Sequence, residues 1–174
     1  MTDSLVIYYS RKGQNYFSGS IRSVAKGNTE YVAEYIANAI GADIFEIDTL
    51  MPYPEDYTEC TEVAKREKRE GFRPELKEYI ADVSAYRNIF VCGPCWWGTF
   101  PMAVFSQLDR LDLKGKSMFA VMTHEGSGMG SSESDLRKRY TEATYREGIE
   151  IQGGRAQSSE EEVSAWAKRM VGKG

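Results

Sequence analysis

The chain has 174 residues, of which 41% are hydrophobic and 28% charged, and these values indicate one globular domain over residues 1–174. Its formal net charge of −4 argues against the basic surface that nucleic-acid-binding proteins show. No apolar run approaches the roughly 18 residues that a membrane-spanning helix needs, and the first residues lack the features of a signal peptide. We therefore expect a cytoplasmic protein without nucleic-acid or membrane partners.

Apolar runs of strand length alternate along the chain with segments of helical spacing. In chain order the pattern predicts strand 4–9, loop 10–31, helix 28–40, strand 42–48, turn 52–57, helices 61–72 and 75–83, strand 88–93, helix 101–111, strand 116–123, helix 131–143, strand 148–153 and helix 159–171. Ser131 or Ser132 is the expected cap of helix 131–143. This order predicts an α/β fold in which a five-stranded parallel sheet lies between two layers of helices, a three-layer αβα sandwich. Ligands of such sheets bind beyond the carboxyl ends of the strands.

The sequence Cys92-Gly93-Pro94-Cys95 has the spacing of a thioredoxin-type dithiol. A reactive thiol of that kind lies at a helix N-terminus, which lowers its pKa. Here Gly98 and Pro101 delay the next helix, so Cys95 is expected in an extended loop and Cys92 in a buried strand. A dithiol function through Cys92 and Cys95 is therefore a remote alternative.

Trp96 and Trp97 follow the same strand. Neighbouring side chains of an extended segment point in opposite directions, so both indoles cannot easily enter one core. We expect one of them to face the crevice at the sheet edge, where a planar ligand can stack on it.

Two further loops are predicted at this edge. Gly27-Asn28-Thr29 opens helix 28–40, and a helix N-terminus with hydroxyl and amide donors can bind an anion. An ordinary cap by Asn28 or Thr29, without a ligand, explains the same residues equally well. The second loop, 123–132, contains three glycines and the only histidine, His124, so no metal cluster can be assembled around histidine ligands.

Three motifs together resemble the flavodoxin family. They are Ser10 with Gly27-Asn28-Thr29, the segment Gly93-Pro94-Cys95-Trp96-Trp97-Gly98-Thr99 with Pro101, and Thr123-His124-Glu125-Gly126-Ser127-Gly128. The resemblance covers nearly the whole chain and implies the strand order 2-1-3-4-5. The chain departs from the usual compact phosphate loop of the family, because residues 11–26 interrupt it.

The resemblance implies non-covalently bound FMN, which carries the chemistry, so no residue of the chain is expected to be catalytic. The implied cofactor-binding residues are Ser10, Lys12, Asn15, Asn28 and Thr29 for the phosphate side, Pro94, Cys95, Trp96, Trp97 and Gly98 on one side of the ring, and Thr123, His124, Glu125, Gly126, Ser127 and Gly128 on the other. Glu125 can equally be a solvated loop acid, and His124 a loop residue that never touches the ring.

Two functions are compatible with this cofactor. An electron carrier would pass electrons between redox partner proteins, whereas an FMN-dependent NAD(P)H or quinone-type oxidoreductase would act on a small molecule. The carrier is the favoured expectation. A flavodoxin-like binding module without cofactor is a further alternative, against which the three complete loops argue.

Overall fold

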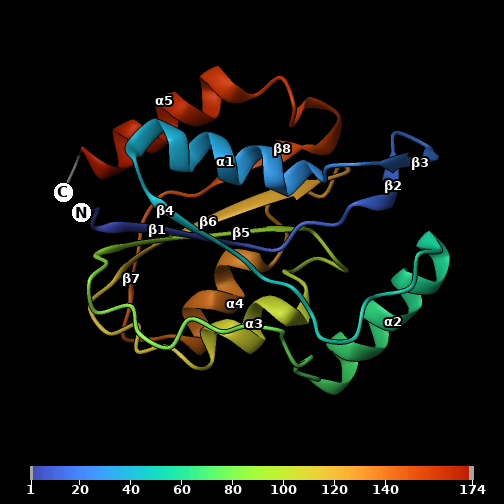
Figure 1. Cartoon of the computed structure of the whole chain (residues 1–174), viewed down its shortest axis with the longest axis horizontal. Coiled ribbons are helices and arrows are strands. Elements are labelled where there is room, and N and C mark those ends of the chain that lie inside the picture. Colours follow the sequence, from blue (N-terminus) through green and yellow to red (C-terminus); the bar gives the residue numbers. More distant parts are fainter. Residues whose placement is uncertain (1, 173–174) are drawn as a thin grey trace.

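The computed structural model describes residues 2–172 and is an α/β sandwich with a mostly parallel sheet at its centre (Figure 1). The strands are β1 (Ser4–Tyr8), β2 (Gly13–Phe17), β3 (Ser20–Val24), β4 (Asp43–Glu46), β5 (Asn88–Pro94), β6 (Ser117–His124), β7 (Thr144–Tyr145) and β8 (Ile149–Gln152). The helices are α1 (Asn28–Ile40), α2 (Tyr57–Glu70), α3 (Met102–Leu108), α4 (Ser132–Arg139), the short 3-10 helix η1 (Gly153–Arg155) and α5 (Glu160–Val171). No helix within residues 2–172 has both the length and the apolar character needed to cross a lipid bilayer.

The central sheet has the strand order β4-β1-β5-β6, with both β7 and β8 paired in parallel to β6. The predicted order 2-1-3-4-5 is thereby confirmed, and the fifth position is shared by two short strands instead of one. β7 pairs with the beginning of β6 and β8 with its end. The single predicted strand 148–153 therefore corresponds to β8 alone.

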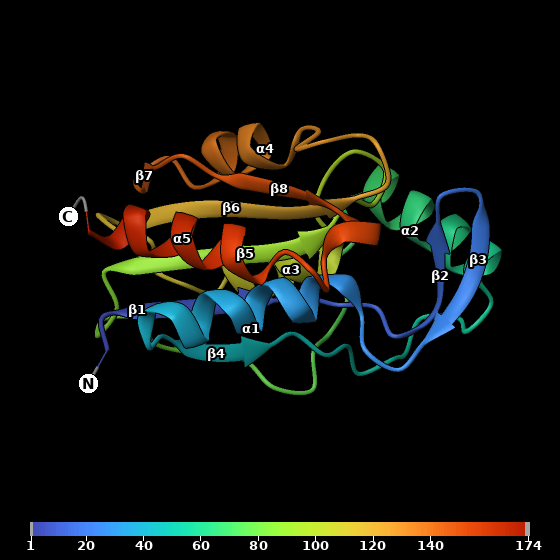
Figure 2. The same cartoon turned by 90° about the horizontal axis from the view of Figure 1, so that it is seen from above.

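Alternation along β1 separates the two faces of the sheet. Leu5 and Ile7 point into a core that includes residues of α3 and α4, whereas Val6 and Tyr8 point into a core built with α1 and α5. Figure 2 shows α1 and α5 side by side over their face of the sheet. A parallel sheet buried on both faces explains the continuous apolar runs of its strands.

The expected helix 75–83 is absent, although its sequence has helical propensity. Gln107 of α3 hydrogen-bonds both backbone groups of Ile80, accepting from its N–H at 2.8 Å and donating to its carbonyl at 3.0 Å. Leu76 forms a bridge to Thr49, and its N–H donates to the hydroxyl of Tyr79 at 3.0 Å. These partners replace the hydrogen bonds that a helix would supply, so the segment crosses α3 as an irregular chain.

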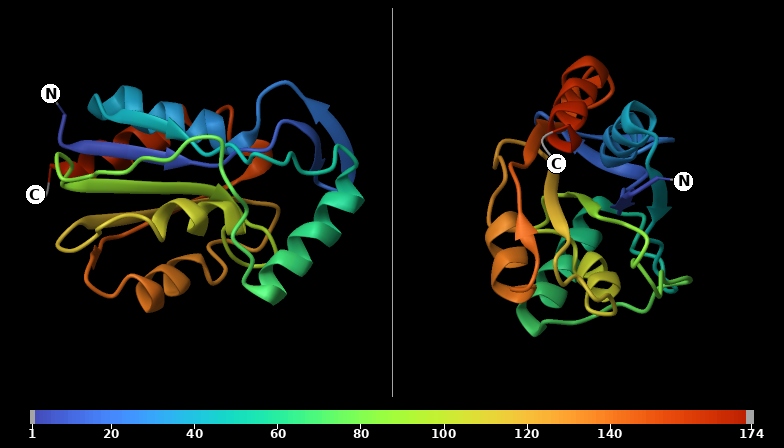
Figure 3. Two further views of the ribbon diagram at one scale, coloured as in Figure 1. Left: turned by 60° about the horizontal axis from the view of Figure 1, so that its bottom comes forward. Right: turned by 90° about the vertical axis from the view of Figure 1, so that its left-hand side faces the viewer.

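The loop predicted at 10–31 contains an antiparallel hairpin, β2–β3, where no strand was expected. Its turn is formed by Ser18 and Gly19, which have positive φ angles of 44° and 98°, as a two-residue hairpin turn requires. Figure 3 shows that the hairpin projects beyond the central sheet and lies next to α2, and the two elements are in contact. In the sequence, the dipeptide Ser18-Gly19 between two five-residue segments is typical of such a turn and could have indicated the hairpin.

Several helix boundaries also differ from the prediction. Helix α2 begins four residues earlier than predicted, at Tyr57, because the side chain of Asp56 accepts a hydrogen bond from the N–H of Glu59 at 2.9 Å. Helix α4 ends at Arg139, and Ser131 occupies its N-cap position without a side-chain capping bond. The prediction that Ser131 or Ser132 caps through its hydroxyl is therefore wrong, since the Ser132 hydroxyl donates to the carbonyl of Met129 instead.

Asp109, at the end of α3, connects three parts of the chain. Its carboxylate accepts hydrogen bonds from Arg73 at 2.8 Å, from Arg139 at 2.7 and 2.9 Å and from Tyr140 at 2.7 Å. Burial by itself would raise the pKa of Asp109, but these donors lower it to about 2. The carboxylate is thus stabilised in its charged form in the folded protein.

We predict that Asp109→Asn lowers the free energy of unfolding at pH 7 by about 1–2 kcal/mol, after allowance for the partial exposure of the carboxylate. Because the pKa is lower in the folded state, this stabilisation is present above the unfolded value of about 4 and disappears as the pH falls through about 2. Urea unfolding of both proteins at several pH values measures the difference. Glu142→Gln, at an exposed position, is the control and should show no such trend. If the free energies of unfolding of the wild type and Asp109→Asn differ by the same amount at pH 7 and at pH 3, the stabilisation does not come from Asp109.

Candidate functional site

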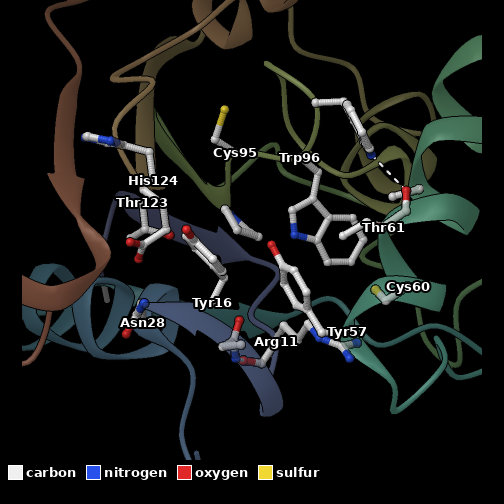
Figure 4. A pocket seen from close by; sticks show the side chains of 15 residues that line it. Arg11, Tyr16, Asn28, Tyr57, Cys60, Thr61, Cys95, Trp96, Thr123 and His124 are labelled. Atoms are coloured by element: carbon white, nitrogen blue, oxygen red, sulfur yellow. Dashed lines mark hydrogen bonds between the residues drawn. The ribbon is translucent and has the colours of Figure 1, made fainter. Parts of the chain in front are cut away.

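One pocket of about 340 Å³ lies at the carboxyl edge of the sheet, where β5 and β6 end (Figure 4). The predicted residues that line it are Asn15, Asn28, Pro94, Cys95, Trp96, Trp97, Thr123, His124 and Glu125. All three predicted loops therefore contribute to one pocket. The predicted residues that do not line it are Ser10, Lys12, Thr29, Gly98, Gly126, Ser127 and Gly128.

The N-terminus of α1 forms one side of the pocket. Gly27 is the N-cap residue, and the hydroxyl of Ser10 accepts a hydrogen bond from the N–H of Glu30 at 3.1 Å. The hydroxyls of Thr29 and Thr123 share a buried hydrogen bond of 2.7 Å. Neither Asn28 nor Thr29 caps α1, so that alternative is wrong, and the side chain of Asn28 lines the pocket instead.

Both tryptophans line the pocket, whereas only one of them was expected to face it. Trp96 packs edge-to-face against Tyr9 and Tyr53, with ring centroids 5.2 and 5.0 Å apart. Trp97 is 45% exposed, has a positive φ of 55°, and donates its indole N–H to the carbonyl of Thr61 at 2.8 Å. Trp96 is thus half-buried and packs against the edge of the core, and Trp97 is held against α2.

Part of the pocket wall consists of residues that were not predicted to belong to the site. These residues are Arg11, Tyr16, Tyr57, Cys60, Thr61 and Ala64, from the hairpin segment and α2. The rings of Tyr16 and Tyr57 are stacked, with centroids 6.1 Å apart and an interplanar angle of 23°. The N–H of Tyr57 donates to the side-chain oxygen of Gln14 at 2.9 Å, which joins α2 to the hairpin. No local sequence signal could have placed α2 here, because these contacts are tertiary.

His124 organises the loop that follows β6. Its Nδ1 accepts a hydrogen bond from the N–H of Gly126 at 2.9 Å, and its Nε2 pairs with the carboxylate of Glu150 on β8. Both ring nitrogens are therefore engaged within the protein. The neighbouring Glu125 carboxylate accepts a hydrogen bond of 3.3 Å from the N–H of Ser18, which joins the same loop to the turn of the hairpin.

The cysteines do not form a reactive dithiol. Cys60, Cys92 and Cys95 are all free thiols. Cys92 is completely buried in β5, and burial raises its pKa, which disfavours the nucleophilic thiolate. Cys95 follows the strand, seven residues before α3 begins at Met102, so no helix N-terminus activates it. The same effect of burial raises the pKa of Cys60.

A family model described as flavodoxin matches residues 14–170. Among solved structures, a candidate flavoprotein from Bacteroides eggerthii is 25% identical, with a TM-score of 0.76, and the match covers 97% of this chain and 98% of the other. A flavoprotein in complex with FMN from Lactobacillus acidophilus is 18% identical, with a TM-score of 0.64 and coverage of 94% and 99%. Oxidised Flavodoxin 2 from Bacillus cereus is 18% identical, with a TM-score of 0.56 and coverage of 98% and 99%. The last two show a shared fold, and no curated protein matches the chain.

We predict that Gly27→Ala destabilises the protein by about 1–3 kcal/mol through overpacking. A Cβ at this position would overlap the hydroxyl of Ser10 and lie 2.5 Å from the carbonyl oxygen of Arg11. Gly154→Ala is the matched control, because nothing lies within 4 Å of a Cβ at that position. Thermal and urea unfolding measure both variants, and equal stabilities would show that the α1 N-terminus is not closely packed against Ser10.

Proposed function

Because the chain belongs to the flavodoxin family, we propose that it binds FMN non-covalently in this pocket and transfers electrons through it. The observation that supports this proposal is the convergence of Asn28, Trp96 and Thr123, from three distant segments, on one cavity. The cavity combines a helix N-terminus with aromatic side chains, and these features suit a phosphate and a planar ring, respectively.

The phosphate is assigned to the N-terminus of α1. The first backbone N–H groups of an α-helix have no partner within the helix, and the helix dipole favours an anion there. The side chain of Asn28 faces the pocket at this point, whereas the Ser10 and Thr29 hydroxyls make hydrogen bonds within the protein. Asn28 and the adjacent backbone N–H groups are therefore the principal phosphate ligands in this proposal. Lys12 and Asn15, from the segment after β1, are secondary ligands, since Lys12 does not line the pocket and the Asn15 amide donates to the carbonyl of Arg11 at 2.6 Å.

The ring is assigned to the space between residues 94–98 and residues 123–128. FMN supplies the electron chemistry when bound, and the chain binds, orients and shields it. Trp96 and Trp97 offer aromatic surface on the first side, and the loop held by His124 forms the second. Since both nitrogens of His124 are engaged by Gly126 and Glu150, this residue positions the loop rather than transferring protons.

An electron carrier that serves redox partner proteins is the first form of this function. A second form, an FMN-dependent reductase acting on a quinone-like small molecule, is favoured by one specific observation. The pocket extends from the α1 side to walls formed by Tyr16, Tyr57 and Trp97, which offer stacking surface to a second planar compound.

Binding of FMN is tested by the visible spectrum of the purified protein and by titration with added FMN. We predict a yellow protein, and Asn28→Ala should weaken FMN binding about tenfold, the effect expected for loss of one hydrogen bond to a charged group. The same substitution should weaken the binding of riboflavin, which lacks the phosphate, far less than the binding of FMN. A colourless protein that takes up no added FMN would refute the proposal.

The two forms of the function differ in their reductive titration. A carrier should be reduced by dithionite in two separate one-electron steps and should be inert towards NAD(P)H. A reductase should be reduced in a single two-electron step and should oxidise NAD(P)H when a quinone is present. Absorbance spectra recorded during both experiments distinguish the two outcomes.

A further inference from the structure

Arg11 is a nearly buried cation in the wall of the pocket. Its side chain donates to three backbone carbonyls, from Nε to Gln14 at 2.8 Å and from Nη2 to Pro54 and Glu55 at 2.9 and 3.0 Å. The residue is 9% exposed and lines the pocket. Within residues 2–172 no carboxylate forms an ion pair with it, and its Nη1 makes no hydrogen bond to any other residue in that range.

The guanidinium lacks a counter-charge, but its Nη1 is not buried. Among the residues that the structure describes, the only buried side-chain nitrogen or oxygen without a hydrogen-bond partner is Trp166 Nε1, so Nη1 is open to water or to a ligand in the pocket. A guanidinium stays charged at all physiological pH values, and burying a charge costs several kcal/mol unless a counter-charge or a full set of hydrogen bonds accompanies it. The three carbonyls orient the side chain, but they carry only partial charges. An anionic group in the pocket would supply both the missing counter-charge and an acceptor for Nη1, since arginine binds planar oxyanions well.

The backbone of Arg11 adjoins the N-terminus of α1, but its guanidinium lies away from the proposed phosphate site. Figure 4 shows its side chain running beneath Tyr57 towards Cys60 and α2, whereas Asn28 lies on the opposite side of the pocket next to α1. Arg11 also acts to lower the pKa of Cys60, which places its charge near this thiol. The anion that Arg11 is placed to bind is therefore separate from a phosphate at the α1 N-terminus.

The surroundings of Arg11 favour a flat ligand. Tyr57 and Tyr16 stack near the guanidinium, and Trp97 is fixed against α2 by its hydrogen bond to Thr61. We propose that the α2 side of the pocket is a subsite for a small planar aromatic compound with an acidic substituent, a carboxylate or a sulfonate, that pairs with Arg11. This inference rests on the reductase form of the proposed function, for which it names the substrate class.

The test compares 2-naphthoate with 2-naphthamide, which have nearly the same shape and differ in charge. Binding to the FMN-loaded protein is measured by equilibrium dialysis and by perturbation of the flavin spectrum. The wild-type protein should prefer 2-naphthoate, and Arg11→Gln should weaken 2-naphthoate binding about tenfold while changing 2-naphthamide binding less than about twofold. Arg11→Lys, which keeps the charge, should retain part of the preference.

Arg66→Gln is the matched control. It removes the same charge from an exposed position on α2 outside the pocket and should leave both affinities unchanged. If Arg11→Gln fails to fold, as judged by circular dichroism, the two ligands are compared on Arg11→Lys instead. This variant keeps the positive charge and loses the forked geometry of the guanidinium.

Three results would overturn the inference. The first is a wild-type protein without preference for 2-naphthoate, and the second is an equal loss of both ligands in the Arg11 variants. The third is an Arg11 variant that loses affinity for FMN but not for riboflavin. This result would show that the anion bound by Arg11 is the FMN phosphate. A protein that binds no FMN would refute the proposed function separately, and the naphthoate comparison on that protein would still test the subsite.

Discussion

The parallel register of β1, β5 and β6 is the constraint on which the pocket depends. Tyr8 pairs with Cys92, and Pro94 pairs with Thr123, so the three strands end at one edge of the sheet. The N–H of Cys95 continues this pairing by donating to the carbonyl of Thr123 at 2.8 Å. The segments that follow these strands are therefore neighbours in space, although they lie far apart in the chain.

The sheet accounts for the floor of the pocket, and polar contacts between outlying segments account for its walls. Helix α2 is joined to the Trp97 loop by the indole of Trp97 and to the hairpin by Gln14. Arg11 joins the exit of β1 to the carbonyls of Pro54 and Glu55, just before α2 begins. Further contacts support the same junctions: Lys68 donates to the carbonyl of Trp97, and the rings of Tyr16 and Tyr57 stack. The α2 side of the ligand space is therefore held by hydrogen bonds and aromatic contacts between segments that lie outside the sheet.

His124 and Glu125 show how one loop can serve two structural purposes. His124 uses both ring nitrogens within the protein, to Gly126 on its own loop and to Glu150 on β8. Glu125 reaches across to the N–H of Ser18 in the hairpin turn. The loop is thus tied to the sheet on one side and to the hairpin on the other, and this double attachment limits how the ligand space at the sheet edge can open.

The sequence by itself determined the central strands, most of the helices and the convergence of Asn28, Trp96 and Thr123, because continuous apolar runs and helical spacing are local signals and parallel strands end together. Only the tertiary structure decided what residues 75–83 form, because Gln107 of α3 takes over the hydrogen bonds of Ile80. It also decided that Arg11 and Tyr57 belong to the pocket. Their positions follow from hydrogen bonds between segments that are more than 40 residues apart, such as the 2.9 Å contact from Tyr57 to Gln14, and no pattern within either segment encodes such a contact.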